Sequence, residues 1–451
     1  MNYQDRLLRA IPGGAHTYSR GHDQFPSNAP HILERGNGAY VWDPDGNKFL
    51  DYGMGLRSVT LGYAYPDVAK AAAEEIFKGN SLTRASVTEL QAAELMIDLI
   101  PSAEMVKFAK NGSNVTTAAA KVARSYTGKK YICVPRQHPF FSFDDWFIGS
   151  TVMSKGVPHE HVSTTLVFDY GDINSLNILF DKHKDQIAGV MLEPSTTITP
   201  CNLDCQNTLS HESPCASCPL NSNNFLHAVQ KLCRENGALF ILDEMITGFR
   251  WHLNGAQTYF GVEPDLSTFG KGMANGFAVS ALVGKREIMD VGSISKNGAE
   301  RTFLLSSTHG AEMVGLRAFI ETIKVYKEKK PCEHMWNYGE RLSSEIMSIS
   351  KELGLENYFF MDGPSICQNY VTKDYDENIS LPLRTLFAQE MVKNGVLMSW
   401  ISTSLSHQDI ELDITLEAVR KSLNIYKRAL NDGVEKYLQS DVIKPVFRKH
   451  N

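Results

Sequence analysis

The sequence predicts an α/β protein with a mostly parallel central sheet and a ligand site at the carboxyl ends of its strands. Residues 239–244 form a short apolar run that ends in Asp243 and a second carboxylate, and residues 265–269 form another that precedes Lys271. Runs of this length are typical of strands buried on both faces. Residues 105–116 follow a strand, small polar loop and helix pattern, which presents backbone N–H groups to a ligand. Open α/β sheets bind ligands at the carboxyl ends of their strands.

Length and composition limit the function. The chain has 451 residues, of which 43% are hydrophobic and 21% charged, and its formal net charge is −6. These values are typical of a globular protein with a large core. We expect no binding to nucleic acid or to a membrane surface, because no long basic tract is present. No apolar run approaches the roughly 20 residues that span a bilayer, so we expect a cytoplasmic protein.

Asp243 and Lys271 together indicate one kind of chemistry. Lysine forms a Schiff base with the aldehyde of pyridoxal phosphate, and a buried carboxylate keeps the pyridine nitrogen protonated. The glycines on both sides of Lys271 leave the backbone clear for a bulky group. A solvated lysine and a capping aspartate would explain an arbitrary pair as well, so the surrounding sequence has to decide.

The surrounding sequence resembles a known family. Residues 242–250, Leu-Asp-Glu-Met-Ile-Thr-Gly-Phe-Arg, with Phe-Gly-Lys-Gly at residues 269–272, closely resemble the class III aminotransferases. They are most similar to the glutamate-1-semialdehyde 2,1-aminomutase branch, and the resemblance covers nearly the whole chain except residues 201–221. It implies the fold type I of pyridoxal-phosphate-dependent transferases, with the cofactor on Lys271 and its pyridinium nitrogen on Asp243.

The resemblance also implies a domain organisation. Residues 1–60, which include a predicted hairpin, are expected to pack with the small domain and the active site. Residues 61–312 would form the large cofactor-binding domain, and residues 313–451 the smaller α+β domain. The family's shared active sites imply a homodimer.

Further cofactor contacts follow from the resemblance. Gly112, Ser113 and Asn114 fall on the turn that holds the cofactor phosphate, although an ordinary helix cap at Ser113 or Asn114 accounts for the local pattern equally well. Glu193, at the end of the apolar run 187–192, resembles the family's glutamate near the reactive edge of the cofactor.

Two more cofactor contacts are predicted, each with an alternative residue. Matching on Asp145-Trp146 puts Phe140 where the family has the tyrosine that stacks on the cofactor ring, and His138 takes that role if the register shifts. Residues 304–310 predict a strand and turn before a long helix. Their counterpart gives a hydroxyl to the cofactor phosphate of the neighbouring subunit, which points to Thr308, with Ser307 as the alternative.

Two arginines are candidates for the substrate site. Arg20 falls on the family's arginine that meets the anionic group of the substrate, although a surface arginine in a linker is the alternative. Arg57 adds a cation to the loop that faces the substrate, and Leu56 stands where the aminomutases have a tryptophan. Both differences argue against glutamate-1-semialdehyde as the substrate.

The sequence therefore predicts an aminotransferase that uses a small-molecule amino donor and a small carbonyl acceptor, with phosphorylated and sugar-derived compounds as candidates. The alternative is an intramolecular aminomutase of the glutamate-1-semialdehyde type. A third hypothesis is a metal-binding or partner-binding module on the same fold without catalysis, which the intact Asp243 and Lys271 argue against.

The insertion at residues 201–221 departs from the family. It carries four closely spaced cysteines, Cys201, Cys205, Cys215 and Cys218. Four thiolates at such spacing can hold a structural zinc ion in a tetrahedron. An iron–sulfur cluster and unligated thiols remain the alternatives, because the spacing does not separate them.

Overall fold

The computed structural model describes residues 2–195, 198–200, 223–295 and 298–450. The chain divides into two compact units, Met1–Tyr65 with Glu333–Val446, and Pro66–Cys332 with Phe447–Asn451. Each is described by itself below, and we call them the first and the second unit. The predicted domain boundaries at residues 60 and 312 stay predictions.

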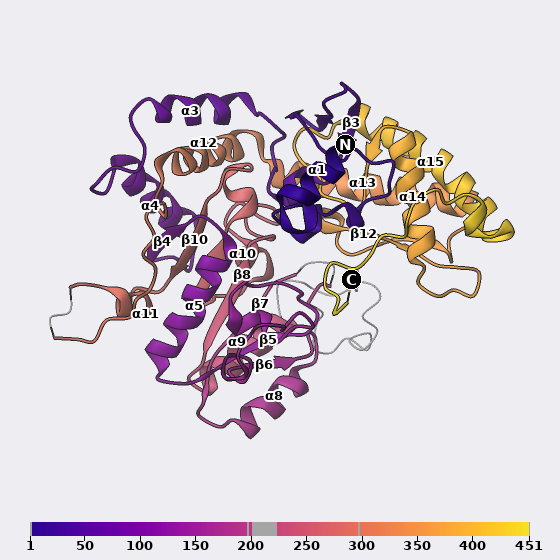
Figure 1. The fold of residues 1–451 in the computed structure, drawn as a ribbon. Helices are drawn as coiled ribbons and strands as arrows, with labels where there is room; N and C mark the ends of the chain where they lie inside the picture. The colour runs from indigo at the N-terminus through magenta and orange to yellow at the C-terminus, as the bar shows by residue number, and fades with distance from the viewer. Residues whose placement is uncertain (1, 196–197, 201–222, 296–297, 451) are drawn as a thin grey trace. The chain divides into compact units, whose positions relative to one another are not determined.

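A seven-stranded sheet forms the centre of the second unit (Figure 1). Its strands, in spatial order, are β4 (Met105–Ala109), β10 (Ser280–Gly284), β9 (Leu266–Phe269), β8 (Leu239–Glu244), β7 (Ile187–Leu192), β5 (Tyr131–Pro135) and β6 (Thr165–Phe168). The strands from β9 to β6 are parallel, whereas β10 is antiparallel to both of its neighbours. Every residue of β7, β8 and β9 is buried, as their apolar sequences require. The α/β fold with a mostly parallel sheet is confirmed.

α-Helices make up most of the remaining regular structure in the described part of the second unit. They are α3 (Pro66–Ile76), α4 (Val87–Leu99), α5 (Gly112–Thr127), α6 (Asp145–Ile148), α7 (His159–Val162), α8 (Ile173–Lys182), α9 (Phe225–Glu235), α10 (Ala256–Phe260), α11 (Arg286–Met289) and α12 (Met313–Lys329). Helix α5 follows β4 directly and buries Val115, Ala119 and Val122 in the core that it shares with the sheet. It ends at Gly128, whose φ of 68° is the left-handed conformation that commonly stops a helix.

The first unit contains a smaller sheet of β1 (Arg35–Asn37), β2 (Tyr40–Trp42), β3 (Lys48–Asp51) and β13 (Val396–Leu397). Strands β2 and β3 form the predicted hairpin, and β13 runs parallel to β3. A second pair joins β11 (Phe359–Asp362) to β12 (Asn369–Thr372). The longer helices are α1 (Tyr3–Ala10), α13 (Pro331–Glu352), α14 (Leu381–Lys393) and α15 (Asp409–Asp432), and the short α2 (Met54–Arg57) follows β3 in the sequence.

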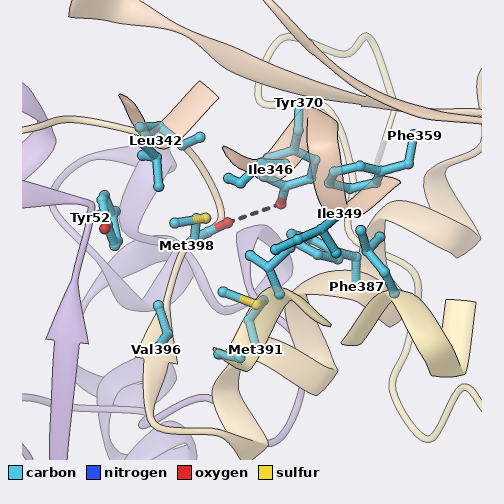
Figure 2. Close-up of a cluster of buried hydrophobic side chains, with 14 of the residues drawn as sticks. Tyr52, Leu342, Ile346, Ile349, Phe359, Tyr370, Phe387, Met391, Val396 and Met398 are labelled. Atoms are coloured by element: carbon cyan, nitrogen blue, oxygen red, sulfur yellow. Dashed lines mark hydrogen bonds between the residues drawn. The ribbon is translucent and has the colours of Figure 1, made fainter. Parts of the chain in front are cut away.

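The core of the first unit joins segments that are far apart in the sequence (Figure 2). Side chains from α13, α14, the β11–β12 pair and β13 pack in one apolar cluster with Tyr52. Within it, the hydroxyl of Tyr370 donates to the carbonyl of Met398 at 3.0 Å, so a buried polar group is satisfied. This packing ties the amino-terminal hairpin to the carboxyl-terminal helices.

One expected element is absent from the described residues. We expected a strand at the start of residues 304–310, but residues 301–307 adopt no regular structure before α12. Leu304 and Leu305 are nevertheless partly buried against the core that includes α5, so the apolar pattern reflects partial burial without strand pairing. The four cysteines of the insertion lie outside the described residues, so the zinc hypothesis stays a prediction. Within the described residues, no cluster of three or more potential metal ligands occurs, and no helix is long and apolar enough to cross a bilayer.

Candidate active site

Asp243 is the buried centre of the site. It lies near the end of β8, 2% exposed, and its Oδ1 accepts hydrogen bonds from the Met245 backbone N–H and the Thr268 hydroxyl, each at 3.0 Å. Burial raises the pKa of Asp243 to about 6, while these two donors and the positive charge of Lys271 act in the opposite direction. The favourable contacts of the charged carboxylate therefore do not offset its cost of desolvation. A further cation beside it would stabilise the charged form.

Lys271 follows the neighbouring strand. Strands β8 and β9 are paired in parallel with Asp243 opposite Thr268, so Lys271 emerges three residues beyond that partner. Its φ of 38° is unusual for a residue with a side chain. Backbone strain of this kind is concentrated at functional sites. The ends of the two strands bring Asp243 and Lys271 close enough that the positive charge of Lys271 acts to lower the pKa of the Asp243 carboxyl.

Met245 connects this pair with the start of α5. A Cβ atom on Gly270 would lie 2.6 Å from the Met245 sulfur, and one on Gly112 would lie 3.0 Å from the same atom. Both glycines therefore pack against one side chain, whose own backbone N–H binds Asp243. The structure thus places the predicted phosphate loop next to the strand ends that carry Asp243 and Lys271.

The start of α5 has the form of an anion site. The Asn111 side chain caps the helix by accepting from the Asn114 N–H at 3.1 Å. Ser113 is buried, and its hydroxyl accepts from the Phe143 N–H at 3.0 Å. Asn111 is therefore the cap, in place of Ser113 or Asn114. The helix runs for 16 residues, so its dipole favours a negative charge at this end.

Glu193 and the aromatic segment lie at the neighbouring strand ends. Glu193 directly follows β7 and is buried, and its N–H donates to Nδ1 of His138 at 3.1 Å. Burial lowers the pKa of His138 to about 3, so this ring is neutral. His138 packs against Phe141 and Tyr170, whereas the ring of Phe140 is 44% exposed. Of the two aromatic candidates, Phe140 presents more of its ring to the exterior of the chain.

Ser307 and Thr308 lie together on an exposed surface. Both line a pocket of about 220 Å³ in front of α12, with Arg84 and other residues of the loop between α3 and α4. This places the two hydroxyl candidates on the face of the second unit that a neighbouring molecule can reach. The structure contains one chain, so their role toward a partner stays a prediction.

Arg20 and Arg57 belong to the first unit. Arg20 is exposed at the end of a short helical turn, and Arg57 is half-buried in the segment after β3. The positive charge of Arg20 acts on Tyr63, and the Tyr63 hydroxyl accepts a hydrogen bond from Gly55, two residues before Arg57. Arg20 and the segment that carries Arg57 therefore both adjoin the Tyr63 phenol.

Sequence reasoning missed Thr268 and Met245. Thr268 was accessible to it, because parallel pairing of the two predicted strands places it opposite Asp243. Met245 was not, because its role depends on a side chain that fills the space beside two glycines from different loops.

Comparison with known proteins identifies the family of this chain. The model of the class III aminotransferases matches residues 18–199 and 218–358. The 3-aminobutyryl-CoA aminotransferase of Cloacimonas acidaminovorans is 30% identical over 436 residues, covering 95% of this chain and 98% of that protein. The structure of the FumI protein of Sphingopyxis sp. MTA144 with pyridoxal phosphate is 26% identical, with a TM-score of 0.83 and coverage of 95% of this chain and 97% of that one.

A glutamate-1-semialdehyde aminomutase from Pseudomonas aeruginosa PAO1 shares the fold at 18% identity, with a TM-score of 0.77 and coverage of 94% of each chain. At that identity the likeness concerns the fold, so the aminomutase branch stays a prediction. The family model spans both Asp243 and Lys271, and the two relatives above each cover 95% of this chain. The chain belongs to the class III aminotransferases and is a pyridoxal-phosphate-dependent enzyme.

Proposed function

We propose that this enzyme transfers an amino group between an amino donor and a small anionic carbonyl compound, with Lys271 and Asp243 as its catalytic residues. The observation that carries the proposal is the buried carboxylate of Asp243 beside Lys271 at two adjoining strand ends. Burial disfavours the charged form of this carboxyl, so a cationic ring bound between Asp243 and Lys271 would stabilise it.

The residues present fit pyridoxal phosphate. Asp243 would bind the pyridinium nitrogen, and the raised pKa of this carboxyl marks a place where a cation offsets the cost of burial. Gly112, Ser113 and Asn114 would hold the phosphate at the start of α5, where the helix dipole and backbone N–H groups favour an anion. The cofactor supplies an electron sink for the carbon that bears the amino group.

Lys271 has two tasks in this proposal. Its Nζ is the covalent attachment point of the cofactor. Once released by the amino donor, the neutral Nζ takes the proton from the carbon that bears the amino group and later delivers it, as a general base must. The left-handed backbone at Lys271 fixes the direction from which its side chain reaches the site.

Phe140 and Glu193 would complete the cofactor site. The exposed face of Phe140 suits stacking on the pyridine ring, and the burial of His138 between two other rings supports Phe140 over His138 for this task. Glu193 lies at the end of β7, beside the strand that carries Asp243, and would stand near the reactive edge of the cofactor.

We further propose a homodimer with shared sites, in which Thr308, or Ser307 beside it, donates a hydroxyl to the partner's cofactor phosphate. Both hydroxyls are exposed on the second unit. Large apolar side chains on the same unit are exposed as well, among them Phe77, Leu82 and Leu90. Exposed apolar side chains that gather in one patch favour burial against another molecule.

Arg20 and Arg57 support an anionic substrate. Phosphorylated and sugar-derived carbonyl compounds are candidates, because guanidinium groups bind phosphate and carboxylate well. The name of the Cloacimonas acidaminovorans relative adds a second class, in which the amino group lies on the carbon β to a thioester. We therefore propose β-amino acids and their thioesters as donors to test beside amino sugar phosphates.

Intramolecular amino transfer is the second candidate, favoured by the resemblance to the aminomutase branch. Leu56, at the position where those enzymes have a tryptophan, argues against glutamate-1-semialdehyde as its substrate. The two reactions differ in their need for an external amino donor. A mutase converts its substrate alone, whereas a transferase requires a second compound.

The attachment site tests the proposal directly. Reduction of the holoenzyme with borohydride, followed by peptide mass mapping, should place a pyridoxyl group on Lys271. Lys271→Ala should lose turnover by at least about a hundredfold, because both the attachment and the proton transfer depend on Nζ. A label on another lysine, or unchanged turnover in the variant, would refute the assignment. Lys285→Ala, which changes a lysine paired with Asp265, is the matched control.

A further inference from the structure

The segment after β3 is strained in a way that the proposed function does not by itself explain. Met54, Leu56 and Arg57 have φ angles of 40°, 59° and 70°, and Gly55 between them has 58°. Residues with side chains adopt this left-handed region only at a cost. A run of such residues persists where surrounding contacts impose it, and these places are enriched at binding sites.

Asp51 holds the first part of this segment, which we call the 53–58 loop. It lies at the end of β3 and is 7% exposed. Its Oδ1 accepts from the Gly53 N–H at 2.8 Å, and its Oδ2 accepts from the Met54 N–H at 2.9 Å. Burial raises the pKa of Asp51, and the hydrogen bonds to its charged form act against that shift.

Tyr63 holds the next part. Its hydroxyl donates to Oδ2 of Asp51 at 2.7 Å and accepts from the Gly55 N–H at 2.8 Å. Three successive amides, those of Gly53, Met54 and Gly55, are thus bound by one carboxylate and one phenol. The Tyr63 hydroxyl is the link, because it is bonded at once to the loop and to the carboxylate.

Tyr63 is itself fixed to the sheet of the first unit. Its N–H donates to the Gly38 carbonyl at 2.8 Å, and its carbonyl accepts from the Gly38 N–H at 2.9 Å. Its ring lies on Gly36, where an added Cβ would come within 2.7 Å of the ring carbon Cγ. The hydroxyl therefore has a fixed position from which to constrain the loop.

The same phenol is near Arg20, and the loop that it holds carries a second arginine, Arg57. Arg57 is in the 53–58 loop, and the positive charge of Arg20 acts on Tyr63 against the burial and the Asp51 charge that raise its pKa. Arginines on two segments that meet at one phenol can bind one anion together, because both guanidinium groups can donate hydrogen bonds to it.

We propose that Asp51 and Tyr63 are positioning residues, which hold the 53–58 loop in its strained conformation so that Arg57, together with Arg20, binds the anionic group of the substrate. This rests on the anionic substrate of the proposed function. If the loop served only to connect β3 with α3, glycines at positions 54, 56 and 57 would achieve the same path without strain. The strained residues and the fixed phenol together indicate that the placement of these side chains matters.

The test compares Tyr63→Phe with Tyr40→Phe in the holoenzyme. Tyr63→Phe keeps the ring on Gly36 and removes the hydroxyl that binds Asp51 and Gly55. Tyr40→Phe is the matched control, since it removes a hydroxyl from the same sheet that binds Glu411 at 2.8 Å. Hydrogen–deuterium exchange reports the amides of residues 53–59, and steady-state kinetics compare 3-aminobutyrate with 2-aminobutane, which lacks the carboxylate.

Tyr63→Phe should speed exchange in residues 53–59 by about tenfold and raise the KM for 3-aminobutyrate by about tenfold, as expected for the loss of a buried hydrogen bond. The KM for 2-aminobutane and the kcat for either donor should stay within twofold, and Tyr40→Phe should change none of these values. Unchanged exchange in Tyr63→Phe would overturn the proposal, and so would an equal rise in KM for both donors.

Failure of the proposed function would look different. A wild-type enzyme that carries the cofactor on Lys271 but accepts neither donor would refute the β-amino substrate class. The proposal would then be decided by the exchange data together with the affinity for inorganic phosphate, measured by calorimetry. Arg57→Gln and Tyr63→Phe should each weaken phosphate binding by about tenfold if the loop presents Arg57 to an anion. Equal phosphate affinity in all variants would overturn it.

Discussion

Asp243 shows how the protein environment sets the behaviour of one residue. Its carboxylate has the two hydrogen-bond donors Met245 and Thr268, yet burial still raises its pKa to about 6. Glu244, the next residue, is also buried, and burial raises its pKa to about 7. Glu244, however, accepts hydrogen bonds from the backbone N–H and the side-chain amide of Gln257 in α10. Its carboxylate therefore holds α10 against β8. Adjacent carboxylates on one strand thus have different tasks because they point to opposite faces.

Asp243→Asn tests the charge of the site. Turnover should fall on the order of a hundredfold, because an amide cannot stabilise the positive ring nitrogen. In the cofactor-free protein, the folded pKa of Asp243 lies above the unfolded value of about 3.9. Its contribution to stability is therefore complete below about pH 4 and is lost as the pH rises through about 6. The melting temperature of the wild type should fall relative to the variant between pH 4 and 7.

Thermal unfolding of both apoproteins across this range provides the measurement. Glu244 titrates in both proteins. Because the charge of Asp243 raises the pKa of Glu244, this coupling is lost in the variant, and it destabilises the wild type in the same direction as the pH rises. Parallel curves for the two proteins would contradict the raised pKa. Binding of the cofactor should reduce the pH dependence, because the ring cation lowers the pKa of the neighbouring carboxyl.

At the scale of elements, the site depends on how strand ends and helix starts meet. Strands β8 and β9 deliver Asp243 and Lys271, and α5 begins directly beside them. Gly112 and Gly270 allow this approach, since both pack against the Met245 side chain. Neither glycine has a positive φ, so space rather than backbone conformation is the reason for glycine at these positions.

Gly270→Ala should therefore weaken cofactor binding. The new Cβ would lie 2.6 Å from the Met245 sulfur, so Met245 or the loop after β9 must move. We expect a loss of stability of about 1–3 kcal/mol, which is typical of overpacking, together with a weaker affinity for the cofactor in spectroscopic titration. The double variant Gly270→Ala with Met245→Ala should recover part of the affinity. Equal affinity in all three proteins would show that this contact does not shape the site.

At the scale of the whole molecule, we propose that two chains share their active sites. Ser307 and Thr308 are exposed beside Arg84 in the pocket before α12. No other chain is present, so the homodimer is a proposal. Mixing two inactive variants can test it, because a shared site combines residues from different chains.

Hybrids of Lys271→Ala and Thr308→Ala should regain activity. If Thr308 acts in the partner's site, one site of each hybrid contains Lys271 and Thr308 of wild-type sequence, and the hybrid reaches about half of the wild-type activity. If Thr308 acts in its own chain, the hybrid has no intact site and gains nothing over the Thr308→Ala parent. Hybrids purified with two different affinity tags provide the measurement, and mixed wild-type chains carrying the same tags are the control.

The pattern of apolar residues in the sequence was enough to predict the main strands. Residues 105–109 and 239–244 form β4 and β8 as expected, because continuous apolar runs between turn signals have few other ways to be buried. The pairing of Asp243 with Lys271, and with it the family, was also evident before the structure. Residues 304–307 were predicted wrongly, since Leu304 and Leu305 are partly buried against the core that includes α5 without pairing to a strand.

The sequence by itself determined the fold class and the enzyme family, and it singled out Asp243 and Lys271 as the proposed catalytic pair, because these depend on local apolar pattern and on motifs of a few residues. The tertiary structure decided what depends on distant partners. It brought Gly112 and Gly270 to Met245, and it joined the 53–58 loop to Tyr63. Such contacts are invisible in the linear pattern, because packing and buried hydrogen bonds form between segments that only the folded chain brings together.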